Sequence, residues 1–142
     1  MPGVQRGPSR RSRRRLRVFA GEVVDAYLDR EDSVRGYIVA FFRGRHVVEP
    51  TGLTDDVAQR YWRELLTVSR AIEDEYTPIK MNVLILGNSM PHLHAHLIPR
   101  YRDDPDAGGP PRFMVGASDA RRMDDIEYLP QVEALRRRLA GK

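Results

Sequence analysis

The hydrophobic positions in the middle of the chain predict one long amphipathic helix. Apolar and aromatic residues recur at steps of three or four positions from Val57 to Ile72, which places their side chains on one face of an α-helix. Thr54 is a favourable N-cap, and the two acidic residues after it lie where the helix dipole favours anions. Pro78 follows shortly after the last apolar position, so we expect the helix to end before it.

Four shorter apolar segments predict β-strands on both sides of this helix. Residues 23–28 and 36–42 precede it, residues 82–86 and 90–100 follow it, and turn-forming residues separate the segments. Strand pairs that flank one helix are typical of an α+β domain, so we expect an antiparallel sheet packed against the helix. These elements place the domain at residues 19–101.

The chain after residue 101 predicts a loop and a second helix that extend the same domain. Residues 102–125 are loop-like and contain the sequence Gly-Gly-Pro-Pro. Pro130 fits the first position of a helix, because its missing N–H would have no partner there. This helix would end at Gly141, with an apolar face formed by Leu129, Val132, Leu135 and Leu139.

The basic residues are concentrated at the N-terminus. Residues 1–18 contain seven of the 24 basic residues and no acid, so the other 17 basic residues accompany 20 acidic ones and the rest of the chain is mildly acidic. Together with Gly, Pro and Ser, the arginines predict a disordered basic tail over residues 1–18. Two interpretations stay open, a solvated leader and an arm that makes weak contact with nucleic acid.

Composition restricts the class of protein. A chain of 142 residues, 41% of them hydrophobic, fits one globular domain. It has no apolar run of membrane-spanning length and no apolar segment after the basic tail, so we expect neither a membrane span nor a secretory signal. The absence of cysteine excludes disulfides and thiolate chemistry and fits a cytoplasmic location.

Three of the four histidines alternate with apolar residues in one short segment. In a strand, His92, His94 and His96 point to one face, and the residues between them point to the core. Imidazole serves as nucleophile, general acid or metal ligand near pH 7. Two chemistries are therefore open: the histidines bind a metal such as Zn²⁺ that keeps a position for water, or one imidazole attacks phosphorus while its neighbours hold the phosphate oxygens.

The residues around the histidines favour the phosphate interpretation. No acidic residue lies within five positions of the three histidines on either side, whereas Arg100 follows them closely. A basic neighbour repels a cation and suits an anion. Asn88 and Ser89, in the turn before the first histidine, supply hydrogen-bond donors for phosphate oxygens.

The sequence Pro91-His92-Leu93-His94-Ala95-His96-Leu97-Ile98-Pro99-Arg100 resembles the motif of the histidine triad (HIT) family. Tyr27-Leu28-Asp29, Gly36-Tyr37-Ile38-Val39, Arg45-His46-Val47 and Gly52-Leu53-Thr54 follow that family's order and spacing upstream. The resemblance covers roughly residues 20–101. It implies a homodimeric α+β protein that hydrolyses or transfers nucleoside monophosphates from dinucleoside polyphosphates, phosphoramidates or related nucleotides, with no obligatory metal or cofactor.

The resemblance also implies roles for the three histidines. The middle one, His94, would be the nucleophile that becomes covalently nucleotidylated. His92 would orient and support it, and His96 would contact the phosphate oxygens. A neutral imidazole is a good nucleophile, and a covalent intermediate divides one difficult displacement into two easier ones.

Further roles follow by position. Asp29 matches the position that binds ribose hydroxyls, and Leu28 and Arg30 would flank the nucleoside. For the homodimer, Trp62 begins a second apolar stripe on the long helix, beside the stripe that serves the chain's own core. A surplus apolar stripe with a tryptophan is typical of an interface. The other interpretation is that the C-terminal helix covers Trp62 within the chain.

Two departures from the family pattern leave other functions open. Many HIT enzymes have a histidine where this chain has Tyr37, which is either a substitute donor or a core residue. The connection from Leu86 to Pro91 is also shorter than the Gly-rich stretch that many of them carry. The alternatives are a nucleotide-binding or sensing module with little turnover, a metal-dependent hydrolase that uses the histidines as ligands, and a nucleic-acid-binding protein that uses the basic tail.

Overall fold

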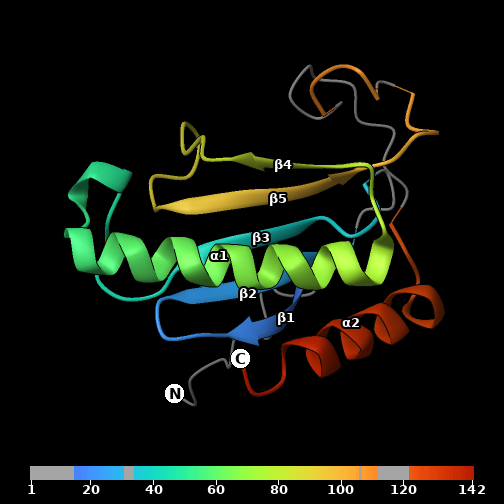
Figure 1. The fold of residues 1–142 in the computed structure, drawn as a ribbon, viewed down its shortest axis with the longest axis horizontal. Helices are drawn as coiled ribbons and strands as arrows, with labels where there is room; N and C mark the ends of the chain where they lie inside the picture. Colours follow the sequence, from blue (N-terminus) through green and yellow to red (C-terminus); the bar gives the residue numbers. More distant parts are fainter. Residues whose placement is uncertain (1–14, 31–33, 106, 112–121) are drawn as a thin grey trace, which may run out of the picture.

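A five-stranded sheet forms the centre of the molecule (Figure 1). The computed structural model describes residues 15–30, 34–105, 107–111 and 122–142. The sheet order is β1-β2-β3-β5-β4, and all neighbours are antiparallel. This confirms the predicted α+β class with an antiparallel sheet. The strands are β1 (Arg15–Ala20), β2 (Val24–Asp29), β3 (Ile38–Phe42), β4 (Lys80–Leu84) and β5 (His94–Arg100).

Two α-helices pack on one face of the sheet, α1 (Asp55–Tyr76) across its middle and α2 (Asp125–Leu139) beside β1 (Figure 1). A short 3-10 helix, η1 (Pro50–Gly52), precedes α1. The Thr54 side chain accepts a hydrogen bond from the backbone N–H of Val57, and the helix ends at Thr77 in a left-handed conformation, so both predicted boundaries of α1 are confirmed. No helix in the described part of the chain has the length and apolar character needed to cross a membrane.

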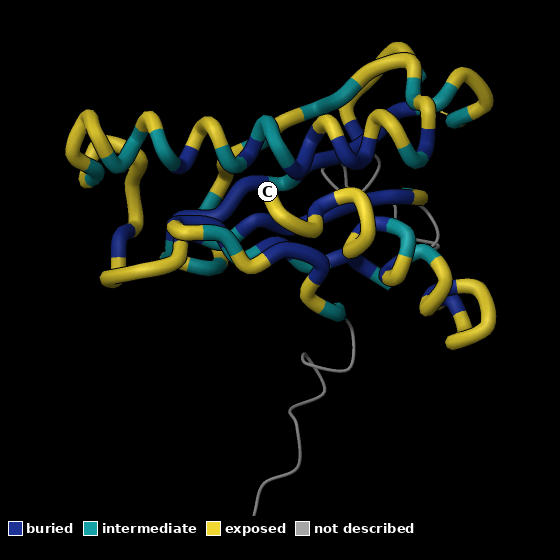
Figure 2. Tube along the Cα trace, turned by 60° about the horizontal axis from the view of Figure 1, so that its bottom comes forward, coloured by how far each residue is buried: buried dark blue, intermediate teal, exposed yellow. Residues whose placement is uncertain are grey.

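The pleat of the strands gives the two faces of the sheet different surroundings. Alternate residues of β2, β3 and β5 point toward the helices and form one buried cluster with the apolar faces of α1 and α2. Figure 2 shows this burial concentrated in the strands and on the inner sides of the helices. Intervening residues such as Val39, Phe41 and His96 point to the opposite face, which neither α1 nor α2 covers. That second face is the one available for a site.

Tyr128 of α2 fastens the first two strands together. Its hydroxyl accepts a hydrogen bond from the backbone N–H of Leu16 and donates one to the carbonyl of Leu28, both at 2.7 Å. Leu16 and Leu28 are opposite one another in the β1–β2 register, and Tyr128 is fully buried. The C-terminal helix therefore holds β1 in the sheet.

Strand β1 corrects the predicted extent of the basic tail. The prediction of disorder over residues 1–18 is wrong from Arg15 onward, because residues 15–20 pair with β2. Val18 and Phe19 are buried, whereas Arg17 points outward. The tail before Arg15, including its expected contact with nucleic acid, lies outside the described residues.

Helix α2 begins earlier than predicted. Asp124 is its N-cap and accepts a hydrogen bond from the backbone N–H of Glu127, so Pro130 lies inside the helix rather than at its first position. Val132, Leu135 and Leu139 are buried as predicted. Leu129 is exposed, because the earlier start replaces it with Tyr128 on the face that meets the sheet.

Candidate active site

Strand β5 places His94 and His96 on the open face of the sheet. Leu93, Ala95 and Leu97 are at most 1% exposed and belong to the core beneath the helices. The predicted division of this segment into a histidine face and a core face is therefore confirmed for residues 93–97. The two imidazole rings lie next to each other, with centroids 5.0 Å apart and planes at 72°.

The ring of His94 has a defined orientation. Its Nδ1 lies 2.7 Å from the backbone carbonyl oxygen of His92, and a carbonyl can only accept, so Nδ1 carries the proton. The lone pair of the neutral ring is then on Nε2. Phe41 stacks on the His94 ring, with centroids 5.6 Å apart. His94 is only 6% exposed. A neutral nucleophilic nitrogen is thereby held in one direction.

His92 lies before β5 and does not share the pocket with the other two. Its Nε2 donates to the carbonyl of Phe42 at 2.8 Å, and its ring stacks on His46, with centroids 5.4 Å apart. His92 therefore lies outside the lining of the pocket, and the regular strand begins only at His94. His92 acts on His94 through its main-chain carbonyl.

His96 is fixed by Tyr37, the residue directly before the neighbouring strand β3. The hydroxyl of Tyr37 lies 2.5 Å from its Nδ1. Burial lowers the pKa of His96 to about 4, the neighbouring His94 and Arg15 act in the same direction, and the carboxylate of Asp29 opposes them. The ring is therefore neutral near pH 7.

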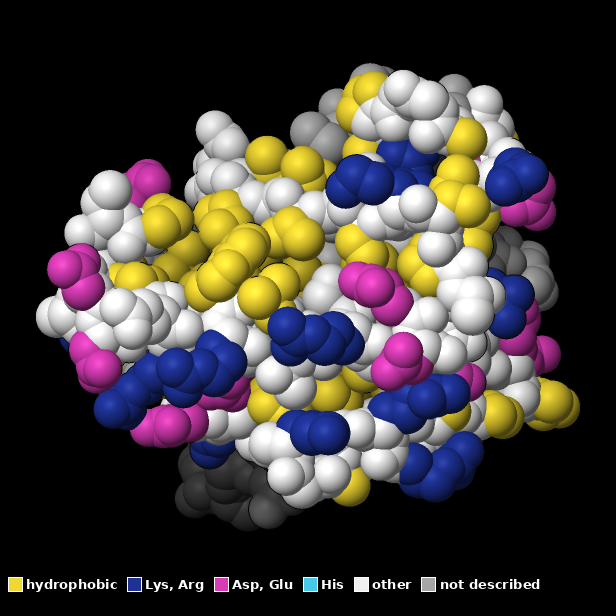
Figure 3. All heavy atoms as spheres, viewed as in Figure 1, with side chains coloured by type: hydrophobic (Ala, Val, Ile, Leu, Met, Phe, Trp, Pro, Cys, Tyr) yellow, Lys and Arg dark blue, Asp and Glu magenta, His cyan; other side chains and the backbone are white. Residues whose placement is uncertain are grey.

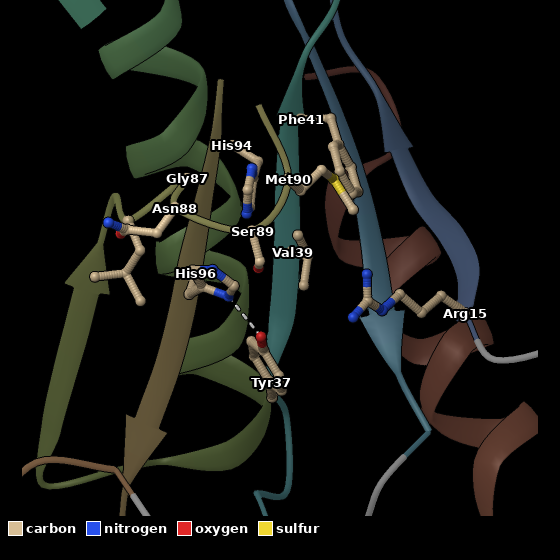
Figure 4. A pocket seen from close by; sticks show the side chains of 11 residues that line it. Arg15, Tyr37, Val39, Phe41, Gly87, Asn88, Ser89, Met90, His94 and His96 are labelled. Carbon is tan, nitrogen blue, oxygen red and sulfur yellow. Dashed lines mark hydrogen bonds between the residues drawn. The ribbon is translucent and has the colours of Figure 1, made fainter. Parts of the chain in front are cut away.

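A pocket of about 330 Å³ opens in front of His94 and His96 (Figure 4). Asn88 and Ser89, the predicted hydrogen-bond donors for phosphate oxygens, line the pocket from the turn before β5. Val39 and Phe41 form an apolar wall. Arg15 reaches the pocket from β1, on the side away from the turn (Figure 4). The pocket thus combines neutral donors, a cation and two histidines.

These residues do not form a metal centre of three or more protein ligands. Within the described ranges, no group of three or more histidine or carboxylate side chains is arranged to hold a metal ion. The Nδ1 of His94 and the Nε2 of His92 are both engaged by backbone carbonyls.

Comparison with known proteins agrees with this geometry. A family model described as the HIT domain matches residues 14–103. The chain belongs to the HIT domain family. The Bacillus subtilis protein named Protein hit is 33% identical over 90 residues, which are 60% of this chain and 61% of that protein. Bis(5'-adenosyl)-triphosphatase of Saccharomyces cerevisiae is 32% identical over 82 residues, or 54% of this chain and 40% of that protein.

Solved structures support the same fold. A histidine triad protein from Bradyrhizobium japonicum superposes with a TM-score of 0.81 at 23% identity, covering 93% of this chain and 96% of that one. The two curated relatives are longer than the segments that match them, since those segments span 61% and 40% of their lengths.

The nucleoside residues expected from the HIT resemblance are not all at the pocket. Leu28 is fully buried in the core, because the pleat turns it toward the helices. Arg30 points to α2, where its Nε donates to the Met123 carbonyl at 2.9 Å and its guanidinium lies over the Tyr128 ring. The pocket therefore has neither of the two predicted nucleoside neighbours.

Asp29 is placed at the end of β2 but does not line the pocket. It is 3% exposed, and its Oδ2 accepts a hydrogen bond from the Nε of Arg15 at 2.9 Å. Arg15 is thus the charged group that this end of the HIT fold presents to the pocket. The sequence contained a signal for it, since Leu16 and Val18 alternate with arginines as in a strand, but the concentration of basic residues concealed that pattern.

Arg100 has a different role from the predicted one. It is 5% exposed, forms an ion pair with Asp104 at 3.3 Å, and donates to Asn82 and to the carbonyl of Gly109. Arg100 is absent from the residues that line the pocket. Its charge therefore stabilises the loop after β5, and the positive charge near the histidines comes from Arg15.

Proposed function

We propose that this HIT protein hydrolyses or transfers a nucleotide at its α-phosphate, with His94 as the nucleophile. The observation that carries this proposal is the hydrogen bond from Nδ1 of His94 to the His92 carbonyl. This bond leaves the lone pair on Nε2. The ring lines a pocket that also contains hydrogen-bond donors for phosphate oxygens. The curated relative named Bis(5'-adenosyl)-triphosphatase supports a dinucleoside polyphosphate as the substrate class.

In the first step, the Nε2 lone pair of His94 forms a bond to the α-phosphorus as the bond from phosphorus to the leaving oxygen breaks. A nucleotide leaves as a phosphate oxyanion and needs no proton from the protein. The imidazole becomes positively charged while Nδ1 keeps its proton, and the His92 carbonyl that accepts this proton in a hydrogen bond stabilises the charge. Asn88 and Ser89 provide donors for the phosphate oxygens.

In the second step, water attacks the phosphorus, the phosphorus–nitrogen bond breaks, and the electron pair returns to Nε2. The released nucleoside monophosphate carries the oxygen of water, one proton goes to solvent, and His94 is neutral again. At the nucleoside end, we propose that Arg15 contacts the sugar and that Asp29, which does not line the pocket, holds Arg15 in position through the hydrogen bond between them.

Substitution of the nucleophile tests the proposal. His94→Ala removes Nε2 while the pocket keeps its donors, so turnover of bis(5'-adenosyl) triphosphate should fall by several orders of magnitude. Affinity for AMP, measured by calorimetry, should change less than about threefold. Turnover within tenfold of the original protein would contradict the mechanism.

A second candidate function is a nucleotide-binding module with little turnover. The short connection from Leu86 to Pro91 favours it, because few donors are available there for a transition state. The distinction is kinetic: a binding module would bind AMP and show no burst of product and no multiple turnover. The metal-dependent alternative predicts activity that chelation abolishes and that stoichiometric Zn²⁺ restores.

We also propose that the protein forms a homodimer through α1 and the β4 edge. Trp62 is 51% exposed, so α2 does not cover it. Val83 of β4 is also exposed, and Figure 3 shows hydrophobic side chains gathered beside α1. Light scattering should give about twice the 16.3 kDa chain mass. Trp62→Glu should halve the measured mass, and Ile126→Glu, an exposed position on α2, should not.

A further inference from the structure

Tyr37 and His96 form a contact that the proposed reaction steps do not use. The β3–β5 register pairs Val39 with His96, which brings Tyr37, two positions earlier, beside the same ring. The Tyr37 hydroxyl lies 2.5 Å from Nδ1 of His96 (Figure 4), and Tyr37 is 9% exposed. The two rings are also close, with centroids 5.9 Å apart. A short bond in such a buried place holds both groups in one arrangement.

The direction of this hydrogen bond determines what His96 offers to a ligand. A neutral imidazole has one N–H and one lone pair. A phenol is a stronger proton donor than a neutral imidazole N–H, so the hydroxyl donates and Nδ1 accepts. The proton of the ring is then on Nε2.

We propose that Tyr37 is a positioning residue that fixes the Nε2–H tautomer of His96, so that His96 donates a hydrogen bond to the substrate phosphate. This inference rests on the proposed function. The two neighbouring histidines then have opposite tautomers: His94 presents a lone pair from Nε2, and His96 presents an N–H. One ring attacks phosphorus, and the other binds the oxygen on which negative charge develops.

The charges around His96 agree with a neutral donor. His94 on the same strand and Arg15 on β1 disfavour a protonated ring, Asp29 on β2 favours it, and the phenol of Tyr37, just before β3, adds no charge. Burial is the largest influence and also favours the neutral ring. A neutral histidine donates from one nitrogen only, so the tautomer decides whether the substrate meets a donor or an acceptor.

The tautomer is measured directly by ¹H–¹⁵N NMR of the histidine side chains in the ligand-free protein at about pH 7. The expected result is a single Nε2–H tautomer for His96 and a single Nδ1–H tautomer for His94. Addition of AMP should shift the Nε2 resonance of His96 more than its Nδ1 resonance. An Nδ1–H tautomer at His96 would overturn the inference whether or not the protein turns over any nucleotide.

Tyr37→Phe removes the hydroxyl and keeps the ring. His96 should then show a mixture of tautomers and a higher pKa, because a hydrogen bond to Nδ1 stabilises the neutral form. With bis(5'-adenosyl) triphosphate, kcat should fall about tenfold while KM changes less than about twofold. Unchanged His96 resonances in a folded Tyr37→Phe protein would refute the role.

Tyr76→Phe is the matched control, because it also removes one tyrosine hydrogen bond, to Gln131 at 2.8 Å, between α1 and α2. It should leave the His96 resonances and kcat unchanged. An equal loss of kcat in both variants would assign Tyr37 to general stability instead. If the tautomers are as expected but no substrate is turned over, the proposed reaction fails and the role of Tyr37 as the residue that sets the tautomer stands.

Discussion

The hydroxyl of Tyr128 should contribute more to the stability of the fold than any ordinary surface hydrogen bond. Tyr128→Phe keeps the ring in the core and removes two hydrogen bonds of 2.7 Å, one from the Leu16 N–H and one to the Leu28 carbonyl. The side chain is fully buried, so water cannot replace the hydroxyl. Each of the two buried groups left without this hydroxyl costs about 1–3 kcal/mol, so the variant should lose about 2–6 kcal/mol in total.

Urea unfolding followed by circular dichroism measures this loss, at one protein concentration because a dimer's stability depends on concentration. With a slope of about 2 kcal/mol per molar urea, the midpoint should fall by about 1–3 M at an unchanged slope. Hydrogen exchange should become faster in β1, which Tyr128 holds in the sheet.

Tyr76→Phe serves as the control here too, because its hydroxyl makes one side-chain hydrogen bond in a partly buried place. It should cost about 1 kcal/mol. A loss below about 0.5 kcal/mol for Tyr128→Phe, with an unchanged slope, would refute the argument that α2 fastens β1 to β2 through this hydroxyl.

Three further predictions concern charge and backbone. Arg15→Met should destabilise the fold by about 1–3 kcal/mol because the buried Asp29 loses its ion pair with Arg15, whereas Arg17→Met, in an exposed ion pair, should cost less than about 0.5 kcal/mol in the same urea assay. Gly36→Ala should lower the melting temperature, because Gly36 has a φ of 83° and a methyl group there would meet a tyrosine ring at 2.8 Å, while Gly108→Ala has open space and should not. His96 has a pKa lowered from 6.5 to about 4, so the unfolded chain binds its proton more readily; the melting temperature should fall between about pH 7 and 4.5, and less so in His96→Gln.

The elements that local patterns define were predictable from the sequence. The long helix has both an apolar period and a capping threonine at Thr54, and the histidine strand alternates strictly, so each signal is contained in a few consecutive residues. Strand β1 was not predictable in the same way, because its arginines have the composition of a disordered tail. Its order comes from pairing with β2 and from Tyr128, which is more than a hundred residues away.

In the candidate site too, the residues defined by a local pattern were predictable, and those that depend on distant contacts were not. His94, His96, Asn88 and Ser89 come from one short segment, and the structure brings them to one pocket. The contribution of Arg15 depends on the register between β1 and β2, which no local pattern reveals. The misplaced roles of Leu28 and Arg30 have a related cause, because the position of a residue in a motif does not say to which face of the sheet its side chain points.

The most direct test of the central claim is detection of the covalent intermediate. The protein is mixed with bis(5'-adenosyl) triphosphate for a short time, quenched at alkaline pH because a phosphorus–nitrogen bond is labile in acid, and analysed by mass spectrometry. The account predicts one added adenylyl group, on the peptide that contains His94, and none in His94→Ala. Turnover with no adduct under these conditions, or an adduct on another residue, would contradict it.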